Sequence, residues 1–280
     1  MKIAKIAKTA KTAKKTVRRR EGWQGWDEYA AFYDWENSQT MGRADVEFWR
    51  ALAGRLNGRT LELGCGTGRI LLPIARSGVE IVGIDRSTPM LVQAHDRLRR
   101  LKTPVRAALV RGDMRHLPFD RAQPFDLIIA AYGVLQSLTR DRDLSATLKA
   151  AVELLAPGGV FALDLVPDVP RWQEYSRRTS LRTTRGPRGL PVTLVESVRQ
   201  DPARKLTIFD QEFTEGRGRT RRVHRFTLTF RTVGIKALRR RLERLGLQID
   251  AVLGSYDGEP WDERADTWML LASKPSPRAE

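Results

Sequence analysis

The feature that most constrains this chain is a glycine-rich segment at residues 61–69, between a short apolar run at 60–63 and an apolar helical pattern at 69–75. Its three glycines stand at alternate positions: Gly64, Gly66 and Gly68. Glycine permits a tight turn and lets a ligand approach backbone that a Cβ would block. The N-terminus of the following helix offers free N–H groups to an anion. The segment therefore predicts a ligand-binding turn between a strand and a helix.

Short apolar strands alternate with helices after this turn. Strands are expected at residues 60–63, 80–84, 107–110, 127–131 and 160–165, helices at 69–75, 90–101 and 144–155, and a turn at 157–159. Apolar strands that alternate with helices predict a parallel sheet covered by helices on both faces. The sequence thus predicts an α/β fold with a doubly wound, mostly parallel sheet.

The hydrophobic period changes in the second half of the chain. Residues 192–199, 206–213 and 223–231 read as alternating strands separated by turn residues, which predicts an antiparallel β-lobe inserted into the α/β unit. A basic helix at 235–245, ended by Gly246, and strands at 248–253 and 267–272 are expected to return to the main sheet.

These patterns divide the chain into five parts. They are a basic flexible tail (1–22), an N-terminal helical flap (23–57), a cofactor-binding α/β core (58–168), the inserted antiparallel lobe (169–232), and a C-terminal helix and strand pair that complete the core (233–275).

The positive charge of the chain is concentrated at its start. Residues 1–20 contain six lysines and three arginines and no acid, so they carry +9 of the formal net charge of +17. Such a composition favours a solvated, flexible extension, and a basic arm that contacts nucleic acid or anionic lipid is the alternative. No apolar run follows the lysines as in a signal peptide, so a cytoplasmic protein is expected.

Several classes of site and location are not expected. A single cysteine, Cys65, excludes an internal disulfide, and three scattered histidines show no zinc-ligand spacing, so no metal site is predicted. Cys65 lacks a neighbouring base that would activate a thiol nucleophile. The apolar stretches are far shorter than the roughly 18 residues that a membrane span needs.

The spacing around the glycines separates two families of nucleotide-binding turns. A dinucleotide site needs a third glycine where this chain has Arg69. The pattern Glu62-Leu63-Gly64-Cys65-Gly66-Thr67-Gly68 instead resembles motif I of the class I S-adenosylmethionine-dependent methyltransferases. Segments 84–91, 112–114, 125–130 and 155–159 resemble the family's later motifs in the same order. The resemblance implies S-adenosylmethionine as the cofactor.

The resemblance also implies which residues hold the cofactor. The expected set is Glu62, Gly64, Cys65, Gly66, Gly68, Asp85, Arg86, Met90, Asp113, Met114 and Ala130. Asp85 would accept hydrogen bonds from the ribose hydroxyls. Asp113 would accept from the exocyclic amine of adenine, and the backbone N–H of Met114 would face the ring. No catalytic residue is predicted, because positioning can supply much of the rate in methyl transfer.

The acceptor is constrained mainly by the segment after the fourth strand. The sequence there is Ala130-Ala131-Tyr132-Gly133, without the Asn/Asp-Pro-Pro-aromatic motif of enzymes that methylate base amines. The β-lobe and segment 254–258 resemble small-molecule methyltransferases, so an N or O atom of a small molecule is expected. Candidate acceptor-binding residues are Tyr29, Tyr33 and Tyr132. An RNA or ribosomal-protein methyltransferase, suggested by arginines at 171–190 and 217–222, and a non-catalytic cofactor-binding protein are the alternatives.

Overall fold

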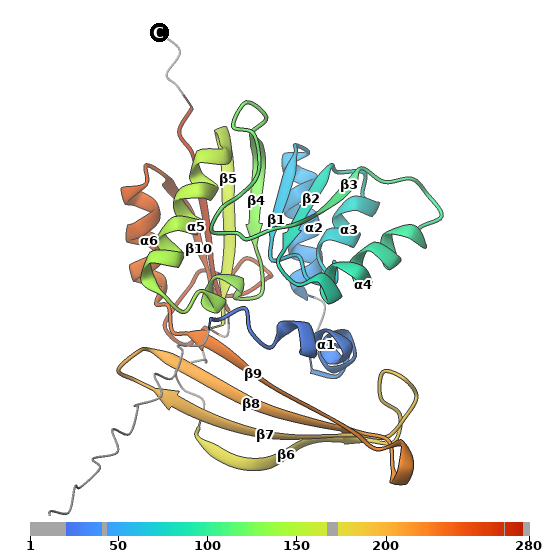
Figure 1. Ribbon diagram of the computed structural model, residues 1–280. Helices are drawn as coiled ribbons and strands as arrows, with labels where there is room; N and C mark the ends of the chain where they lie inside the picture. Colours follow the sequence, from blue (N-terminus) through green and yellow to red (C-terminus); the bar gives the residue numbers. More distant parts are fainter. Residues whose placement is uncertain (1–20, 41–43, 167–172, 266, 277–280) are drawn as a thin grey trace, which may run out of the picture.

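The protein consists of a seven-stranded α/β core and a separate four-stranded antiparallel sheet (Figure 1). The structure is a computed structural model that describes residues 21–40, 44–166, 173–265 and 267–276. The core sheet has the order β10-β11-β5-β4-β1-β2-β3, and β11 alone among its strands runs against the others. This architecture confirms the predicted α/β class with a mostly parallel sheet and an inserted β-lobe.

The helices and strands follow one another along the chain as expected for this class. The helices are α1 (Trp26–Thr40), α2 (Ala44–Leu56), α3 (Leu71–Arg76), α4 (Thr88–Arg99), α5 (Asp141–Leu154) and α6 (Ile235–Arg244). The core strands are β1 (Thr60–Leu63), β2 (Ile81–Asp85), β3 (Ala107–Arg111), β4 (Phe125–Ala130), β5 (Leu155–Leu165), β10 (Gln248–Leu253) and β11 (Trp268–Ser273). The lobe strands are β6 (Tyr175–Thr183), β7 (Val192–Asp201), β8 (Leu206–Glu215) and β9 (Arg222–Arg231).

Helices cover both faces of the core sheet because its central strands are apolar on both faces. All four residues of β1 are buried. One face packs against α2 and α3 through Trp49 and Ile74, and the other against α5 and α6 through Leu148 and Leu242. Burial of this apolar surface is the main contribution to the stability of such a core.

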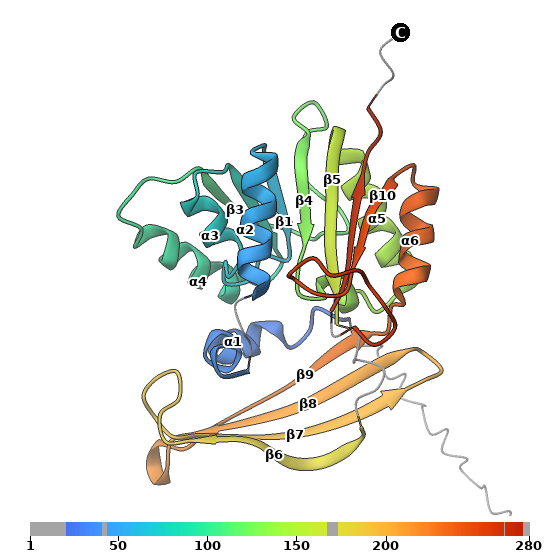
Figure 2. The ribbon, with the colours of Figure 1, turned by 180° about the vertical axis from the view of Figure 1, so that it is seen from behind.

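The β-lobe lies across one end of the core sheet, with α1 between the two (Figures 1 and 2). Apolar residues alternate along β7 and β8 and point toward α1. Phe213 of β8 stacks on Phe32 of α1 with ring centroids 4.2 Å apart, and Phe226 of β9 lies 5.4 Å from the ring of Tyr29. The helix α1 is thus the element that joins the lobe to the core.

The predicted helical flap is two elements with different partners. α1 packs between the lobe and α4, whereas α2 packs on α3 and belongs to the core. The sequence assigned both helices to one flap because Phe48 and Leu52 continue the helical spacing of the preceding aromatics. Helical spacing predicts a helix but does not show which surface the helix covers.

Three further expectations need correction. The residues 157–159, predicted as a turn, lie within β5, where Gly158 donates a hydrogen bond to the carbonyl of Lys274. The strand β6 was not predicted, because most of its side chains are exposed and several are arginines, which removes the alternating pattern. The predicted tail 1–22 extends too far, because Glu21 and Gly22 contact the core. Its first 20 residues lie outside the described residues.

Within the described part of the chain, no helix combines the length and the apolar character that a membrane span requires.

Candidate functional site

A cavity of about 450 Å³ lies at the carboxyl ends of the core strands, beneath the β-lobe. Loops after β1 to β4 form its floor with residues 64–66, 85–87, 111–115, 131–134 and 136–139. Its roof is aromatic and comes from outside the core: Trp26 and Tyr33 of α1, Phe209 of β8 and Phe230 of β9. The edge of a doubly wound sheet where strands end is where ligands bind in such folds.

The glycine-rich turn opens onto this cavity at Gly66. All three of its glycines have positive φ, between +51° and +79°, a region that favours glycine. A Cβ on Gly64 would lie 2.3 Å from Val134 and one on Gly68 2.8 Å from Leu72, so these two glycines are required by packing. A Cβ on Gly66 would meet no protein atom within 4 Å. Gly66 is therefore the position where backbone is left open to a ligand.

Asp85 closes β2 and turns its carboxylate onto the glycine turn. One oxygen accepts from the N–H of Gly66 at 2.8 Å and the other from the N–H of Ser87 at 2.7 Å. Burial raises the pKa of Asp85, and these backbone donors oppose the rise. No ion pair with a described residue neutralises the carboxylate, so it remains available to hydrogen-bond donors in the cavity.

Glu62 is a buried acid that also lines the cavity. Its side chain is 4% exposed, and its Oε2 atom has no hydrogen-bond partner among the described residues. Burial raises its pKa to about 8; the cation of Arg69 opposes the rise, and the neighbouring carboxyl of Asp85 adds to it. A buried acid without a partner costs free energy unless something else meets it. Its position on the cavity points to a cationic group of a ligand as that partner.

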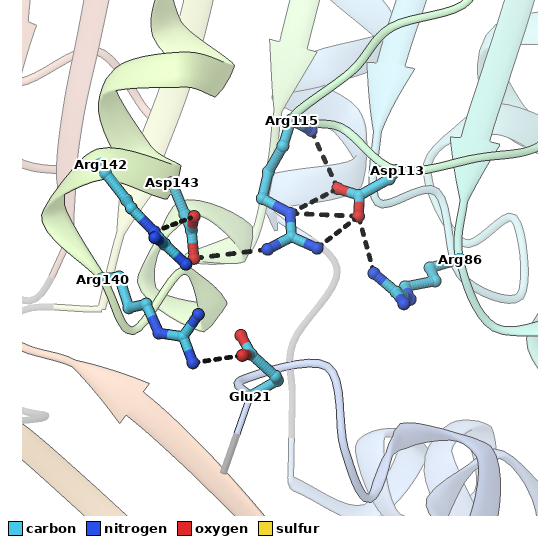
Figure 3. A network of polar contacts seen from close by, with 7 residues as sticks. All are labelled: Glu21, Arg86, Asp113, Arg115, Arg140, Arg142 and Asp143. Carbon is cyan, nitrogen blue, oxygen red and sulfur yellow. Dashed lines mark hydrogen bonds and ion pairs between the residues drawn. The ribbon is translucent and has the colours of Figure 1, made fainter. Parts of the chain in front are cut away.

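Asp113 is held by two arginines on the opposite side of the cavity (Figure 3). Arg115 contacts both of its oxygens, at 2.9 and 2.6 Å, and Arg86 contacts one of them at 2.6 Å. Although partial burial alone would raise the pKa of Asp113, the bonds from Arg115 lower it. Recognition of an adenine amine by this carboxylate would require one arginine to give up its contact.

The segment before α1 closes the mouth of the cavity. Glu21 forms an ion pair with Arg140 (Figure 3), and Arg86 lies over the ring of Trp23 at 4.1 Å. The backbone of Gly22 packs so tightly that a Cβ there would lie 1.6 Å from the carbonyl oxygen of Ser137. Glu21 and Gly22, assigned from the sequence to the flexible tail, and Trp23, assigned to the helical flap, belong to the cavity wall.

The aromatic side of the cavity contains two of the three predicted acceptor residues. Tyr33 and Tyr132 line it on either side of Arg69, whose guanidinium lies 5.2 Å from the Tyr132 ring centroid. Arg69 is itself paired with Asp45 at 2.5 Å. Tyr29 does not line the cavity, because its ring is buried in the hydrophobic cluster that α1 forms with the lobe.

Most of the predicted cofactor residues converge on the same cavity. Those that line it are Glu62, Gly64, Cys65, Gly66, Asp85, Arg86, Met90, Asp113 and Met114. Gly68 and Ala130 do not: Gly68 faces Leu72, and Ala130 is fully buried in β4 while Ala131 lines the wall in its place. Burial raises the pKa of the Cys65 thiol well above its usual value, consistent with its predicted role as a small loop residue.

Apart from Tyr132, sequence reasoning missed the residues that the lobe and the loop after β4 contribute. Phe230 of β9 lines the cavity, whereas Phe226 of the same strand lies in the lobe core. Gln136 and Thr139 also line the wall, and the Thr139 hydroxyl is buried without a partner among the described residues. No local pattern distinguishes an aromatic that packs from one that lines a cavity, because both are apolar.

Comparison with known proteins agrees with this geometry. Residues 60–159 match a family model described as a methyltransferase domain. The cypemycin N-terminal methyltransferase of a Streptomyces species is 28% identical over 243 residues, which cover 86% of this chain and 94% of the relative. The solved CcbJ methyltransferase from Streptomyces caelestis shares the fold with a TM-score of 0.74 at 18% identity, over 91% of this chain and 99% of that one.

A second solved structure, the sugar N-methyltransferase KedS8 from a Streptoalloteichus species, has a TM-score of 0.68 at 16% identity and covers 87% of this chain and 93% of its own. This chain has the fold of the class I methyltransferases, and the glycine turn lies inside the residues that match the family model. Residues 60–159 are the methyltransferase domain of this enzyme, and S-adenosylmethionine is its cofactor.

Proposed function

We propose that the enzyme transfers a methyl group from S-adenosylmethionine to an N or O atom of a small molecule, with an amine nitrogen as the favoured acceptor. The observation that carries the proposal is the enclosure of the cavity by α1 and the lobe through Trp26, Phe209 and Phe230. A volume of about 450 Å³ is in the range of small-molecule sites.

The chemistry of the lining supports the amine. Aromatic faces attract cations, and the roof presents Trp26, Tyr33 and Phe230 to the interior. Of the four arginines that line the cavity, Arg69, Arg86 and Arg115 are each paired with a carboxylate. The similar proteins from Streptomyces and Streptoalloteichus are named for methyl transfer to an N-terminus and to a sugar nitrogen, which agrees with an amine acceptor in this chain.

The cofactor fits the floor of the cavity. Glu62, with its partnerless oxygen, is the candidate for the α-amino group of the methionine moiety, and the open backbone at Gly66 leaves room beside it. Asp85 would accept hydrogen bonds from the ribose hydroxyls. The side chains of Arg86, Met90 and Met114 would border the adenine. Gly64, Cys65 and Asp113 complete the proposed set; Gly68 supports the turn from behind.

The bound cofactor supplies a methyl group on a cationic sulfur, which is already activated for displacement. The chain's own residues then need to orient the acceptor, exclude water and hold its lone pair in line with that methyl group. Tyr33 of α1 and Tyr132 of the loop after β4 both line the cavity. We propose that these two side chains contact the acceptor. Both have raised pKa values caused by burial, and they therefore act as neutral hydrogen-bonding groups rather than as phenolates.

Labelled S-adenosylmethionine with a panel of acceptors tests the proposal. The panel contains amino sugars and short peptides with a free N-terminus, and each is matched by an analogue in which a hydroxyl replaces the amine. We expect label transfer to at least one amine and a lower kcat/KM for its hydroxyl analogue. Transfer to bulk RNA alone, with no small acceptor labelled, would contradict the proposal.

The expected location and the role of the basic segment are part of the same proposal. We propose that the enzyme acts in the cytoplasm, where its cofactor is made, and imaging of a fluorescent fusion checks this. A contact of residues 1–20 with nucleic acid is the alternative role for that segment, which the structure does not describe.

A further inference from the structure

The turn after β4 has an unusual backbone for a cavity wall. Tyr132 and Gly133 both have left-handed φ values, +56° and +62°. Such a conformation is disfavoured for a tyrosine because its Cβ crowds the backbone, so the surrounding structure must hold it in place. The turn leads directly from the buried strand β4 into the segment that lines the acceptor side of the cavity.

A buried carboxylate holds this turn. Asp164 of β5 is 1% exposed, and its Oδ1 accepts from the N–H of Gly133 at 2.7 Å. The N–H of Tyr132 also donates to the Asp164 carboxylate. Two successive backbone donors on one acid fix both left-handed residues at once, since loss of either bond would leave a buried donor unpaired.

The second oxygen of Asp164 is held from a third part of the chain. The hydroxyl of Tyr256, in the loop between β10 and β11, donates to Oδ2 at 2.8 Å. Tyr256 lies in segment 254–258, which resembles small-molecule methyltransferases in sequence and which the cofactor site does not use. Its ring contacts Phe48 of α2 with centroids 5.9 Å apart, so the hydroxyl is supported from the core.

A neighbouring pair of hydrogen bonds joins the same two loops. The Gln136 amide donates to the carbonyl of Val166 at 3.0 Å and accepts from the Val166 N–H at 2.8 Å. A Cβ on Gly133 would lie 2.4 Å from Oε1 of Gln136, so glycine is required where the turn passes this amide. Gln136, Val166 and the turn all line the cavity.

We propose that Asp164 and Tyr256 are a positioning pair for the acceptor: by fixing the turn at Tyr132 and Gly133, they place the Tyr132 ring and the Gln136 wall against the bound acceptor. The pair does not line the cavity itself. The role in acceptor binding rests on the proposed function. The control of the turn by Asp164 and Tyr256 does not depend on it. Segment 254–258 thus affects acceptor binding through Tyr256, although it does not line the cavity.

The variant Tyr256→Phe tests the proposal because it removes one hydroxyl and keeps the ring against Phe48. The matched control is Tyr175→Phe, which removes a hydroxyl bonded to another mostly buried carboxylate, Glu196, in the lobe and away from the cavity. Three quantities are compared: the affinity for S-adenosylmethionine by calorimetry, kcat and KM for the best amine of the panel, and amide hydrogen exchange of residues 131–137.

We expect Tyr256→Phe to lower kcat/KM for the acceptor by about tenfold, the effect of weakening one hydrogen bond to a charged group, and to speed exchange in residues 131–137. Cofactor affinity should stay within about twofold of the wild type, since the pair lies outside the cofactor site, and Tyr175→Phe should change none of the three. Unchanged exchange in residues 131–137 would overturn the proposal, and so would an unchanged acceptor kcat/KM.

The two hypotheses fail separately. If wild-type enzyme labels no small acceptor, the proposed function fails, while faster exchange of residues 131–137 in Tyr256→Phe still supports control of the turn by the pair. If the wild type labels an amine and Tyr256→Phe matches Tyr175→Phe in every measurement, the positioning pair fails and the function stands. Asp164→Asn, which keeps one oxygen for the backbone donors, should show the same direction of change as Tyr256→Phe.

Discussion

Two acids of the core cavity and three acids of the lobe differ in their partners. In the lobe, Asp210, Glu212 and Glu215 each form an ion pair with an arginine of the same sheet or its turns. In the core cavity, Glu62 and Asp85 have no arginine partner among the described residues and are met by backbone donors or by none. A buried acid without a cation is costly to a fold, so we infer that the three ion-paired lobe acids serve stability and that Glu62 and Asp85 serve a ligand.

The same comparison changes the interpretation of the basic lobe. Of the arginines at 171–190 and 217–222 that suggested RNA, Arg188 is bound to a lobe acid, and Arg199 and Arg225 elsewhere in the lobe are also bound to lobe acids. The charge of these three arginines is balanced within the lobe. Matched variants can therefore test whether changes in the core cavity weaken ligand binding and whether changes in the lobe lower only the free energy of unfolding.

The largest effect is expected at Asp85. Asp85→Ala should weaken cofactor binding by about 1.5–3 kcal/mol, the range for hydrogen bonds to a charged group, measured by calorimetry. The control is Glu215→Ala in the lobe, which loses the pair with Arg188. It should lower the free energy of unfolding by about 1 kcal/mol, because Arg188 is partly exposed, and leave cofactor affinity unchanged. Full affinity in folded Asp85→Ala would show that the ribose is held elsewhere.

A pair of glycines sharpens the comparison. Gly66 in the core and Gly189 in the lobe both have positive φ, and a Cβ on either would meet no protein atom within 4 Å. Alanine at either position should cost about 1–2 kcal/mol of stability through its left-handed backbone. Only Gly66→Ala should also weaken the cofactor, about tenfold, since its Cβ enters the cavity. Equal cofactor affinities in the two variants would place the ligand away from Gly66.

A smaller effect is expected in the protons that accompany binding. The pKa of Glu62 is raised from 4.5 to about 8, so the folded protein holds a proton there that the unfolded chain releases. Binding of this proton favours the folded state. Its contribution to the free energy of unfolding is complete below pH 4.5 and is lost as the pH rises through about 8. A cofactor ammonium beside Glu62 favours its ionised form, so binding near neutral pH should release up to about one proton.

Calorimetry in buffers of different ionisation enthalpy measures this release. Glu62→Gln should abolish it. Glu36→Gln is the control, because Glu36 also has a pKa raised by burial, to about 7, but does not line the cavity. Loss of proton release in the Glu36 variant, with release retained in the Glu62 variant, would reverse the assignment.

Local signals predicted the core well because its elements depend on burial and on backbone geometry. All four residues of the strand β1 are buried, and the turn after it needs glycine at three left-handed positions. The lobe edge β6 was missed because exposure removes the alternation that reveals a strand. Contacts between distant segments were also out of reach: Tyr256 and Asp164 lie 92 residues apart, and no property of either residue alone indicates the other.

The smallest effect is expected from the basic segment, where deletion of residues 1–20 should leave cofactor affinity and small-molecule turnover unchanged. The segment carries +9 and no acid, and it lacks the apolar surface that would offset the entropy of ordering it. The described wall of the cavity begins at Glu21, which pairs with Arg140. Truncation at Glu21 therefore keeps every described residue that lines the site.

Measurement at two salt concentrations separates this expectation from binding of nucleic acid. If the segment neutralises phosphates, its removal should reduce the slope of log affinity for RNA against log salt by about 0.7 for each phosphate of a single strand that is no longer neutralised. Small-molecule turnover should show no such dependence in either protein. A salt-dependent loss of methyl transfer on truncation would tie the basic segment to the acceptor, and the enclosed cavity beneath the lobe would then not define the substrate by itself.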